Sequence, residues 1–293
     1  MGAVKRIATA AAETAEMIKL SHTVFALPFA VIAMAEAADP GWPPLRTWLW
    51  VLAAMVSART AAMTFNRLAD RRFDATNPRT AGRALPAGRL SPRFAAAVTA
   101  VASAAFVGSA AALGPLCLAL SPVALAWILG YSLTKRFTAL AHLWLGLGLG
   151  IAPVGAWLAV TGRFAVEPLV LAGAVTCWVA GFDIVYSLQD ESFDRAAGLH
   201  SLPAALGAAR ALAVARVLHV LAVAGFAAFA AMTGGGPLRW GAVAAAAGLL
   251  VWQHRLVRPD DLSRVDAAFF TANGILSLAM GTAFLFAKML GAP

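Results

Sequence analysis

The chain has 293 residues, of which 61% are hydrophobic and only 13% are charged, and its mean hydropathy is +0.77. A soluble domain usually has about one quarter charged residues, so this composition excludes an ordinary soluble domain. The net charge of +9 is spread over short loops, without a basic segment interleaved with aromatic residues. We therefore expect no nucleic-acid partner.

Apolar residues fall into nine runs, each close to the ~20 residues that cross a bilayer core. The runs span residues 20–37, 47–66, 94–113, 116–134, 139–161, 167–188, 209–232, 238–254 and 267–288. Backbone polar groups cannot stay unpaired in lipid, so we expect these runs to be helices rather than strands. The sequence therefore predicts an all-α integral membrane protein with nine transmembrane helices in one bundle.

Basic residues indicate how the chain is oriented. With nine spans, the N-terminus and the loops 67–93, 135–138, 189–208 and 255–266 share one side, and they hold most of the 23 Lys and Arg residues. The opposite side shows Arg46, Arg163, Arg239 and Lys288. The positive-inside rule then places the N-terminus in the cytoplasm. We expect a multi-pass protein of the inner (cytoplasmic) membrane without a cleavable signal peptide, because Glu13 and Glu16 interrupt the N-terminal segment.

No linker or low-complexity stretch divides the chain, so we expect one domain over residues 1–293. The sequence shows a weak internal repeat, because one aspartate-rich segment follows the second predicted helix and another follows the sixth. This pattern suggests two related halves, about 18–136 and 137–293, that each contribute an acidic array to one shared, cytoplasm-facing polar cavity.

The first array lies at the cytoplasmic end of the second predicted helix. Asn66, Asp70 and Asp74 are four residues apart, so they form a polar stripe on one helix face. Asn77-Pro78 then disfavours further helix, which places Asp74 near the last turn. An isolated Asp pair of this kind more often marks a solvated helix end than a site.

The second array follows the sixth run. On the sixth predicted helix, Asp183, Asp190 and Asp194 share one stripe, with Tyr186 one turn before Asp190. Two arrays in one membrane chain favour a functional site, since carboxylates at membrane depth are costly. Hard oxygen ligands of this kind suit Mg²⁺ bound together with substrate phosphate oxygens.

Cations accompany both arrays. Arg67, Arg71, Arg72, Arg79 and Arg83 surround the first array, and Lys135 and Arg136 lie between the two. A diphosphate needs metal on one side and guanidinium or ammonium groups on the other. The competing explanation is plain membrane topology, which we prefer for Arg89, Arg93, Arg255 and Arg258.

These motifs resemble those of the UbiA superfamily of intramembrane prenyltransferases. The resemblance rests on Asn66-Arg67-x-x-Asp70-x-x-x-Asp74, on Asn77-x-Arg79-Thr80-x-x-Arg83, on Tyr131-Ser132-x-x-Lys135-Arg136, and on Asp183-x-x-Tyr186-x-x-x-Asp190-x-x-x-Asp194. Leu85-Pro86-x-Gly88 resembles the 4-hydroxybenzoate polyprenyltransferase branch, although Ala84 stands where that branch often has proline. The N-terminal segment 18–29 resembles hydroxybenzoate-transferase-like proteins of menaquinone producers that use the futalosine route.

The resemblance implies a Mg²⁺-dependent polyprenyltransferase of ubiquinone or menaquinone biosynthesis. It implies that Asn66, Asp70 and Asp74 bind one Mg²⁺ and that Asp190 and Asp194 bind another. The diphosphate-binding candidates are Arg67, Arg71, Arg79, Arg83, Lys135, Arg136 and Lys19. The catalytic candidates are Asp183, Tyr186, Asp70 and Asp190, with Asp183 either orienting the aromatic acceptor or assisting its deprotonation.

Other acceptors stay open, namely haem, a chlorophyllide or a glycerol phosphate. A transporter of a phosphorylated lipid or divalent cation is the alternative from another class, although such sites usually lie near the membrane midplane. The five histidines show no metal-ligand spacing, and we expect most of them to be structural or interfacial. Gly146, Gly148, Gly150 and Gly155 are expected to serve helix packing before they serve a prenyl groove.

Overall fold

The computed structural model describes residue 13 and residues 23–291, and this part of the chain is helical throughout. The long helices are α2 (Thr23–Ala37), α3 (Leu45–Thr76), α4 (Pro92–Leu113), α5 (Pro115–Thr134), α6 (Ala141–Thr161), α7 (Val166–Ser187), α10 (Ala208–Met232), α11 (Gly236–Leu256) and α12 (Asn273–Met289). Short helical segments are η2 (Leu188–Asp190), α8 (Glu191–Ala196), α9 (Leu202–Leu206) and the π-helical η3 (Ala267–Ala272). No strand occurs among the described residues, which confirms the all-α prediction.

Each predicted apolar run overlaps one of the long helices. Seven helical segments in the described part of the chain are long and apolar enough to cross a membrane. α2 is a shorter apolar helix there, and α11 does not meet the same criterion. A multi-pass membrane protein is therefore confirmed, whereas the count of nine spans stays a prediction.

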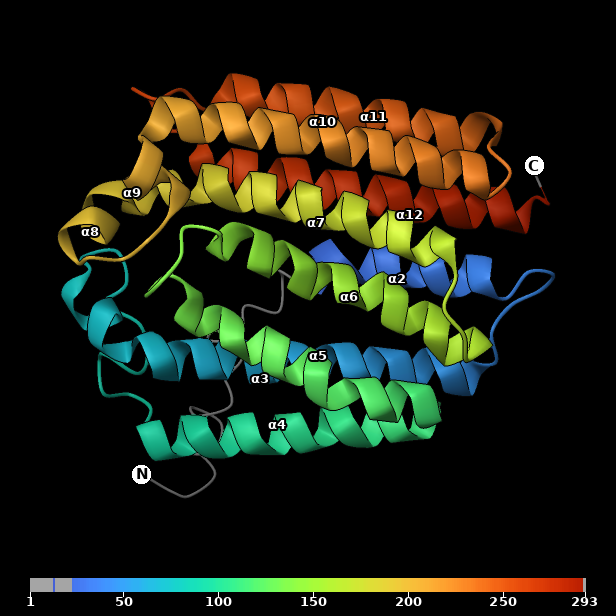
Figure 1. The fold of residues 1–293 in the computed structure, drawn as a ribbon, viewed down its shortest axis with the longest axis horizontal. Helices are drawn as coiled ribbons and strands as arrows, with labels where there is room; N and C mark the ends of the chain where they lie inside the picture. The colour runs from blue at the N-terminus through green and yellow to red at the C-terminus, as the bar shows by residue number, and fades with distance from the viewer. Residues whose placement is uncertain (1–12, 14–22, 292–293) are drawn as a thin grey trace.

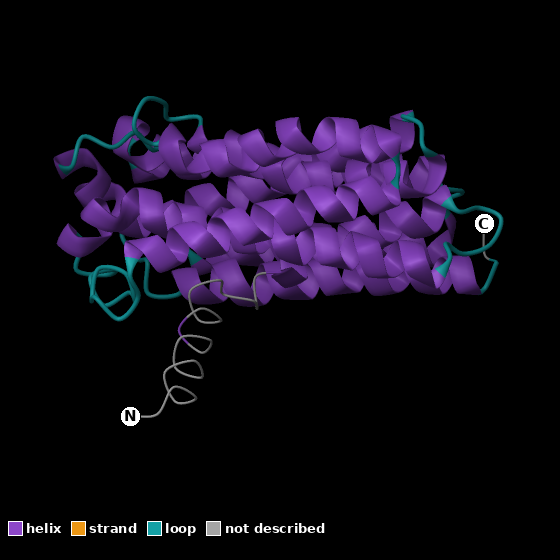
Figure 2. Cartoon of the chain, turned by 90° about the horizontal axis from the view of Figure 1, so that it is seen from below, coloured by secondary structure: helices purple, strands orange, loops and turns teal. Residues whose placement is uncertain are grey.

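The long helices run side by side along the long axis of the molecule, with their connections at the two ends (Figures 1 and 2). α3, α4 and α5 lie on one side, α7 and α10–α12 lie on the other, and α2 and α6 lie between them (Figure 1). α8 and α9 cover the end at which α3 finishes, and the last turn of α12 lies at the opposite end (Figure 1).

α3 is longer than its apolar run predicts. Its 32 residues extend over about 48 Å, whereas a bilayer core is about 30 Å thick. The helix stops at Thr76, and Asn77, which precedes a proline, takes an extended conformation with φ −87° and ψ 118°. The polar last turns of α3, including Asp70 and Asp74, therefore stand at the end of the bundle.

Two glycines let α6 lie against α7. A Cβ atom on Gly146 would lie 2.3 Å from the carbonyl oxygen of Thr176, and one on Gly150 would lie 2.6 Å from the Thr176 hydroxyl. Only glycine permits this approach, which confirms helix packing as the role of these two positions. Gly148 and Gly155 differ, because both line a cavity described below.

The main core is aromatic and joins α2, α7 and α10. Trp178 is fully buried and packs against Phe29, whose ring stacks on Phe226 at 5.4 Å between centroids. The indole N–H of Trp178 donates to the Asn273 side chain at 2.8 Å, which connects α7 to the start of α12. This packing fixes α7, the helix that leads into the second acidic array.

Candidate active site

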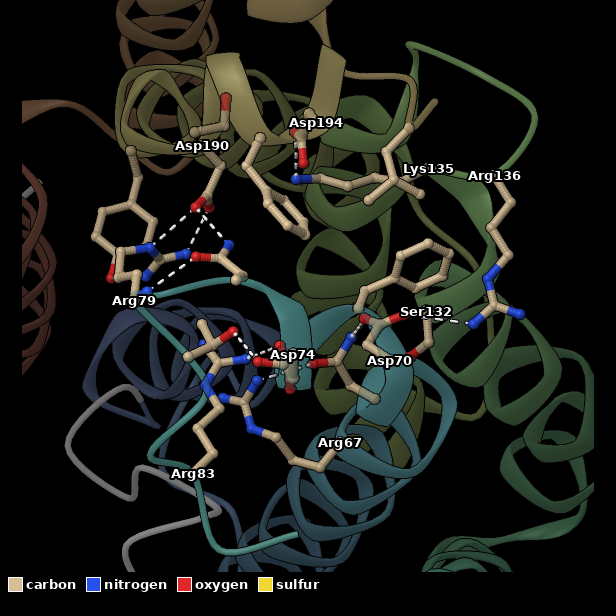
Figure 3. A pocket seen from close by; sticks show the side chains of 18 of the residues that line it. Arg67, Asp70, Asp74, Arg79, Arg83, Ser132, Lys135, Arg136, Asp190 and Asp194 are labelled. Atoms are coloured by element: carbon tan, nitrogen blue, oxygen red, sulfur yellow. Dashed lines mark hydrogen bonds and ion pairs between the residues drawn. The ribbon is translucent and has the colours of Figure 1, made fainter. Parts of the chain in front are cut away.

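A polar pocket of about 200 Å³ lies where α3 and α7 end, and both acidic arrays line it. Its charged walls are Arg67, Asp70, Asp74, Arg79, Arg83, Lys135, Arg136, Asp183, Asp190 and Asp194. Figure 3 shows Asp70 and Asp74 on one side and Asp190 and Asp194 on the other. The two arrays, separated by more than 100 residues in the chain, therefore share one pocket, as the sequence predicted.

The first array forms the expected helical stripe on α3. The amide of Asn66 donates to Asp70 Oδ2 at 2.9 Å, one turn along the helix. Arg67 donates to the side-chain oxygen Oδ1 of Asn66 at 3.2 Å, and the Arg67 side chain is buried. Asp74 follows one turn after Asp70 and is 6% exposed. These contacts hold the side-chain oxygens of the stripe toward the pocket.

The second array does not lie on one continuous helix, so the prediction of a single stripe was wrong. α7 ends at Ser187, Asp190 belongs to the 3₁₀ turn η2, and Asp194 belongs to α8. A 3₁₀ turn rises more steeply and has fewer residues per turn, so the side chains change direction there. Asp190 and Asp194 nevertheless both line the pocket.

Arg79 ties the loop after α3 to the second array. Its Nε donates to Asp190 Oδ1 at 3.0 Å, and its terminal nitrogen forms an ion pair with Oδ2. The same guanidinium lies over the ring of Tyr186, 5.6 Å from the centroid. Burial lowers the pKa of Arg79, but the hydrogen bonds and charge of Asp190 outweigh that effect and raise it overall. The guanidinium is therefore charged at any physiological pH.

Three further ion pairs follow the same pattern of one carboxylate with one cation. Arg83 donates to Asp74 Oδ1 at 2.7 Å, Lys135 donates to Asp194 Oδ2 at 3.1 Å, and Arg136 lies 3.4 Å from Asp70 Oδ1. With Arg79 and Asp190, four of the five pocket aspartates have an Arg or Lys as partner (Figure 3), and Asp183 is the exception. The pocket thus holds groups that bind metal ions and groups that bind anions in direct contact.

An apolar cavity of about 410 Å³ adjoins the polar pocket. Its walls come mainly from α3, α4, α5 and α6, and they include Met55, Phe106, Leu113, Trp127 and Leu149. Trp127 and Trp144 stack at 3.9 Å between centroids and exchange indole hydrogen bonds with each other's carbonyl oxygens. The cavity suits a flexible hydrocarbon chain.

Six residues line both the polar pocket and the apolar cavity, and we call them the boundary ring. They are Asn66, Arg67, Arg83, Tyr131, Asp183 and Tyr186. The two catalytic candidates of α7, Asp183 and Tyr186, thus lie where polar and apolar compartments meet. A molecule with an anionic head and an apolar tail would place its head–tail junction at this ring.

Not every predicted binding residue belongs to the pocket. Arg71 is exposed and does not line it. Lys19 lies outside the described residues. Three residues that the sequence singled out only as parts of family motifs also line the pocket, namely Thr80, Tyr131 and Ser132. The Ser132 hydroxyl is buried and has no hydrogen-bond partner among the described residues.

Two buried polar residues escaped the sequence prediction. Arg59 lines the apolar cavity, and its Nε is buried without a hydrogen-bond partner in the described part of the chain. His142, which we expected to be structural, lies 2.7 Å from Asp183 through its Nδ1. A sequence signal existed for Arg59, because an ionisable residue inside an apolar run is by itself a reason to suspect a site.

The side chains of the pocket fit a magnesium ion bound together with a phosphate-containing substrate. All the candidate ligands are oxygen donors, and Asp74 Oδ2 is buried without a hydrogen-bond partner among residues 23–291. Within the same range, no three His, Cys, Asp or Glu side chains are close enough together to hold a metal by themselves. Mg²⁺ is usually held by one or two carboxylates plus substrate oxygens, which agrees with this arrangement.

Comparison with known proteins places this site in a family. Residues 26–275 match the model of the UbiA prenyltransferase family. A 4-hydroxybenzoate octaprenyltransferase of Nitrosospira multiformis is 30% identical over 238 residues, which cover 81% of this chain and 82% of that protein. One from Aromatoleum aromaticum is 30% identical over 243 residues, covering 83% and 82%.

Solved structures give the same result. A UbiA homologue from Aeropyrum pernix K1 is 37% identical, with a TM-score of 0.82 over 90% of this chain and 97% of that one. A UbiA homologue from Archaeoglobus fulgidus, solved with GPP and Mg²⁺, is 20% identical and shares the fold, with a TM-score of 0.72 over 94% and 99%. The chain therefore belongs to the UbiA prenyltransferase family and is a membrane-embedded prenyltransferase.

Proposed function

We propose that the enzyme transfers a polyprenyl group from an isoprenyl diphosphate to an aromatic acid, 4-hydroxybenzoate or a related quinone precursor, in a Mg²⁺-dependent reaction. The observation that carries this proposal is the boundary ring, which joins a pocket of carboxylates and cations to an apolar cavity. An isoprenyl diphosphate has this combination of an anionic head and an apolar tail.

The diphosphate head is bound in the polar pocket. Arg79, Arg83, Lys135 and Arg136 supply cations, and Arg67 supplies another from the boundary ring. Asn66, Asp70 and Asp74 on one wall, and Asp190 and Asp194 on the other, would hold Mg²⁺ together with the diphosphate. Mg²⁺ held there would neutralise charge on the leaving diphosphate.

The polyprenyl tail lies in the apolar cavity. There its methylene groups leave water, at a gain of ~0.8 kcal/mol for each CH₂ buried. The same walls keep water away from C1 of the prenyl group, where a cation develops as the bond to oxygen breaks. Polar head and apolar tail therefore bring C1 to the boundary ring, next to Asp183 and Tyr186.

Arg59 supports an acceptor that carries a carboxylate. It lies seven residues before Asn66 on α3, on nearly the same face and about 10 Å deeper. The Nε of the half-buried Arg59 has no hydrogen-bond partner among the described residues, and an aromatic carboxylate reaching into the cavity would supply an anionic partner. The acceptor would then have its acid group at Arg59 and its reactive carbon toward Asp183.

The chemical step consists of one bond broken and one bond formed at C1. The C1–O bond breaks and its electron pair leaves with the diphosphate oxygen. A π-electron pair of the acceptor ring, enriched by the ring hydroxyl, forms the new C–C bond. The proton on that ring carbon passes to Asp183, and the electrons of the C–H bond return to the ring. The ring of Tyr186 would stabilise the developing cation, and Arg79, which contacts Tyr186, would bind the departing anionic head.

The names of relatives support the same substrates. Two proteins that match more than four fifths of this chain are 4-hydroxybenzoate octaprenyltransferases. The Archaeoglobus fulgidus homologue, which shares the fold, was solved with GPP or DMAPP and Mg²⁺. Haem, a chlorophyllide or a glycerol phosphate are weaker candidates as acceptor, since no such name occurs among those relatives. A transporter is no longer a candidate, because the chain is a prenyltransferase.

The site faces the cytoplasm in this proposal. Its end of the bundle contains most of the basic loops, including Lys135, Arg136 and Arg83, and the positive-inside rule favours that side for the cytoplasm. A water-soluble aromatic acid would then enter from the cytoplasm of the cell, and the enzyme would reside in the inner membrane.

The test is prenyl transfer by the purified protein in detergent, with Mg²⁺, a long-chain isoprenyl diphosphate and a panel of aromatic acids. We expect a prenylated 4-hydroxybenzoate or related acid, with kcat at least about 100-fold lower in Asp70→Asn and Asp190→Asn. A product formed only from an acceptor without an acid group would contradict the proposed acceptor class. Diphosphate release equal in both variants and wild type would contradict the proposed site.

A further inference from the structure

His142, at the start of α6, is in contact with Asp183 on α7. Its Nδ1 lies 2.7 Å from Asp183 Oδ2, and the imidazole is fully buried. On its other side, the backbone N–H of Leu202 donates to His142 Nε2 at 3.3 Å. The ring is therefore held from both edges, with a carboxylate on one and an amide on the other.

This pair of contacts determines which nitrogen carries the proton. A backbone N–H only donates, so His142 Nε2 must be the unprotonated nitrogen. A neutral imidazole then has its single proton on Nδ1, and that N–H must donate to Asp183 Oδ2. The Oδ2 atom is consequently an acceptor in this contact and cannot carry a proton toward His142.

We propose that His142 is a positioning residue for the reaction: it occupies Oδ2 of Asp183 and leaves Oδ1 as the oxygen that takes the acceptor's proton. This inference rests on the proposed function, because it refines how Asp183 acts there. Asp183 belongs to the boundary ring, so its side chain lines both compartments.

The fold builds this contact from two features that serve no other part of the site. Gly146, one turn after His142, brings α6 against α7 and so sets the distance between the two side chains. Leu202 is the first residue of the short helix α9, where backbone N–H groups lack partners within the helix. His142 satisfies one of these donors, so α9 in turn fixes the orientation of the imidazole.

The proton follows a balanced route. As the ring of the acceptor regains its electrons, Asp183 Oδ1 binds the proton and the carboxylate becomes a carboxylic acid. That acid then releases the proton to water in the polar pocket and returns to its ionised form. His142 keeps its own proton throughout, which is why we describe it as a positioning residue rather than as the base.

Two substitutions of His142 separate this role from simple packing. His142→Leu removes the donor, whereas His142→Asn keeps an amide N–H near the position of Nδ1. Asp183 shares the boundary ring with Arg67, Arg83, Tyr131 and Tyr186, and both variants leave these groups in place. His219→Leu is the matched control, because His219 is also buried and hydrogen-bonded but lines neither cavity.

The kinetic test measures kcat together with KM for the isoprenyl diphosphate. We expect kcat of His142→Leu to fall about tenfold to hundredfold while KM for the donor stays unchanged. His142→Asn should restore most of kcat. A rise in donor KM that accounts for the whole loss of activity in His142→Leu, or an equal loss of kcat in His219→Leu, would overturn the proposal.

A spectroscopic test stands even if the acceptor proves to be another molecule. In protein with ¹⁵N-labelled histidine, the signals that disappear in His142→Leu belong to His142. They should report a neutral ring protonated on Nδ1, and the Nδ1 signal should move in Asp183→Asn. A ring protonated on Nε2, or one that does not respond to Asp183→Asn, would refute the role of His142 without bearing on prenyl transfer itself.

Discussion

Arg79 and Asp190 are 111 residues apart in the chain, yet the guanidinium of one contacts both carboxylate oxygens of the other. The contact joins the loop after α3 to the turn after α7. A Mg²⁺–diphosphate complex offers an anion to Arg79 and a cation to Asp190, so both groups would exchange one ionic partner for another. The same exchange is available to the pairs of Asp74 with Arg83 and of Asp194 with Lys135.

We expect Arg79→Lys to raise KM for the isoprenyl diphosphate about tenfold. Lysine keeps the charge but loses the planar fork that contacts both oxygens of Asp190 and the face of Tyr186. Steady-state kinetics with varied donor concentration measure the change. Arg89→Lys is the control, since Arg89 pairs with Glu13 outside the pocket, and an equal effect there would point to general charge at this end of the bundle.

Arg59→Leu should separate acceptor binding from stability. Removing a buried charge should leave the free energy of unfolding unchanged or raise it by about 1 kcal/mol. KM for the aromatic acid should rise by tenfold or more, while KM for the isoprenyl diphosphate stays the same. Thermal unfolding in detergent measures the stability of the variant. Two kinetic series, one with varied aromatic acid and one with varied isoprenyl diphosphate, measure the two KM values. A less stable variant with normal acceptor KM would show that Arg59 serves the fold instead.

Chelation of divalent cations should abolish prenyl transfer, and added Mg²⁺ should restore it. Asp74→Asn should need a higher Mg²⁺ concentration for half-maximal activity, because it removes one of the proposed oxygen ligands. The measurement is the rate of product formation as the concentration of free Mg²⁺ is varied. Helical content measured by circular dichroism controls for unfolding, and full activity in the presence of a chelator would contradict the metal proposal.

Gly146→Ala should weaken the contact between α6 and α7. The added Cβ would lie 2.3 Å from the Thr176 carbonyl oxygen, and overpacking of this kind costs about 1–3 kcal/mol. His142 would move away from Asp183, so kcat should fall with the free energy of unfolding. Gly173→Ala on α7 provides the control, because a Cβ there meets nothing within 4 Å. Unchanged stability in Gly146→Ala would show that the helices separate at no cost.

Gly155→Leu should shorten the range of donors that the enzyme accepts. Gly155 lines the apolar cavity, and a Cβ on it has open space around it. The leucine would fill space that we assign to the distal part of the tail, so kcat/KM for long isoprenyl diphosphates should fall more than for geranyl diphosphate. Competition between a long and a short donor measures the ratio, and Gly173→Leu should leave that ratio unchanged.

Much of the fold could be predicted from the sequence, because apolar runs of the right length become helices in lipid whatever their partners are. The first array was also predictable, since Asn66, Asp70 and Asp74 lie within one helix whose end is marked by Asn77-Pro78. The break after Ser187 was not. Nothing in the local sequence distinguishes a 3₁₀ turn there from a continuing helix, and the packing of α8 decides it.

Pairings between distant helices could not be predicted either. His142 shows no metal-ligand spacing, and its importance depends on Asp183 being 41 residues away in sequence and 2.7 Å away in space. That distance follows from the approach of α6 to α7 at Gly146, which single-sequence periodicity does not reveal. Arg59 was recognisable as unusual within its apolar run, but its cavity is completed mainly by three other helices, α4, α5 and α6.

The boundary ring separates the part of the site that carries out the chemistry from the part that accommodates the prenyl chain, and this separation bears on how such enzymes diversify. Since the anionic head is fixed on one side of the ring, every donor is aligned from its first carbon, and its length is taken up beyond that point. Substitutions among the cavity walls would then change which prenyl chain is transferred without changing the bond that is formed. Changes of lipid length and changes of chemistry would be inherited as separate traits.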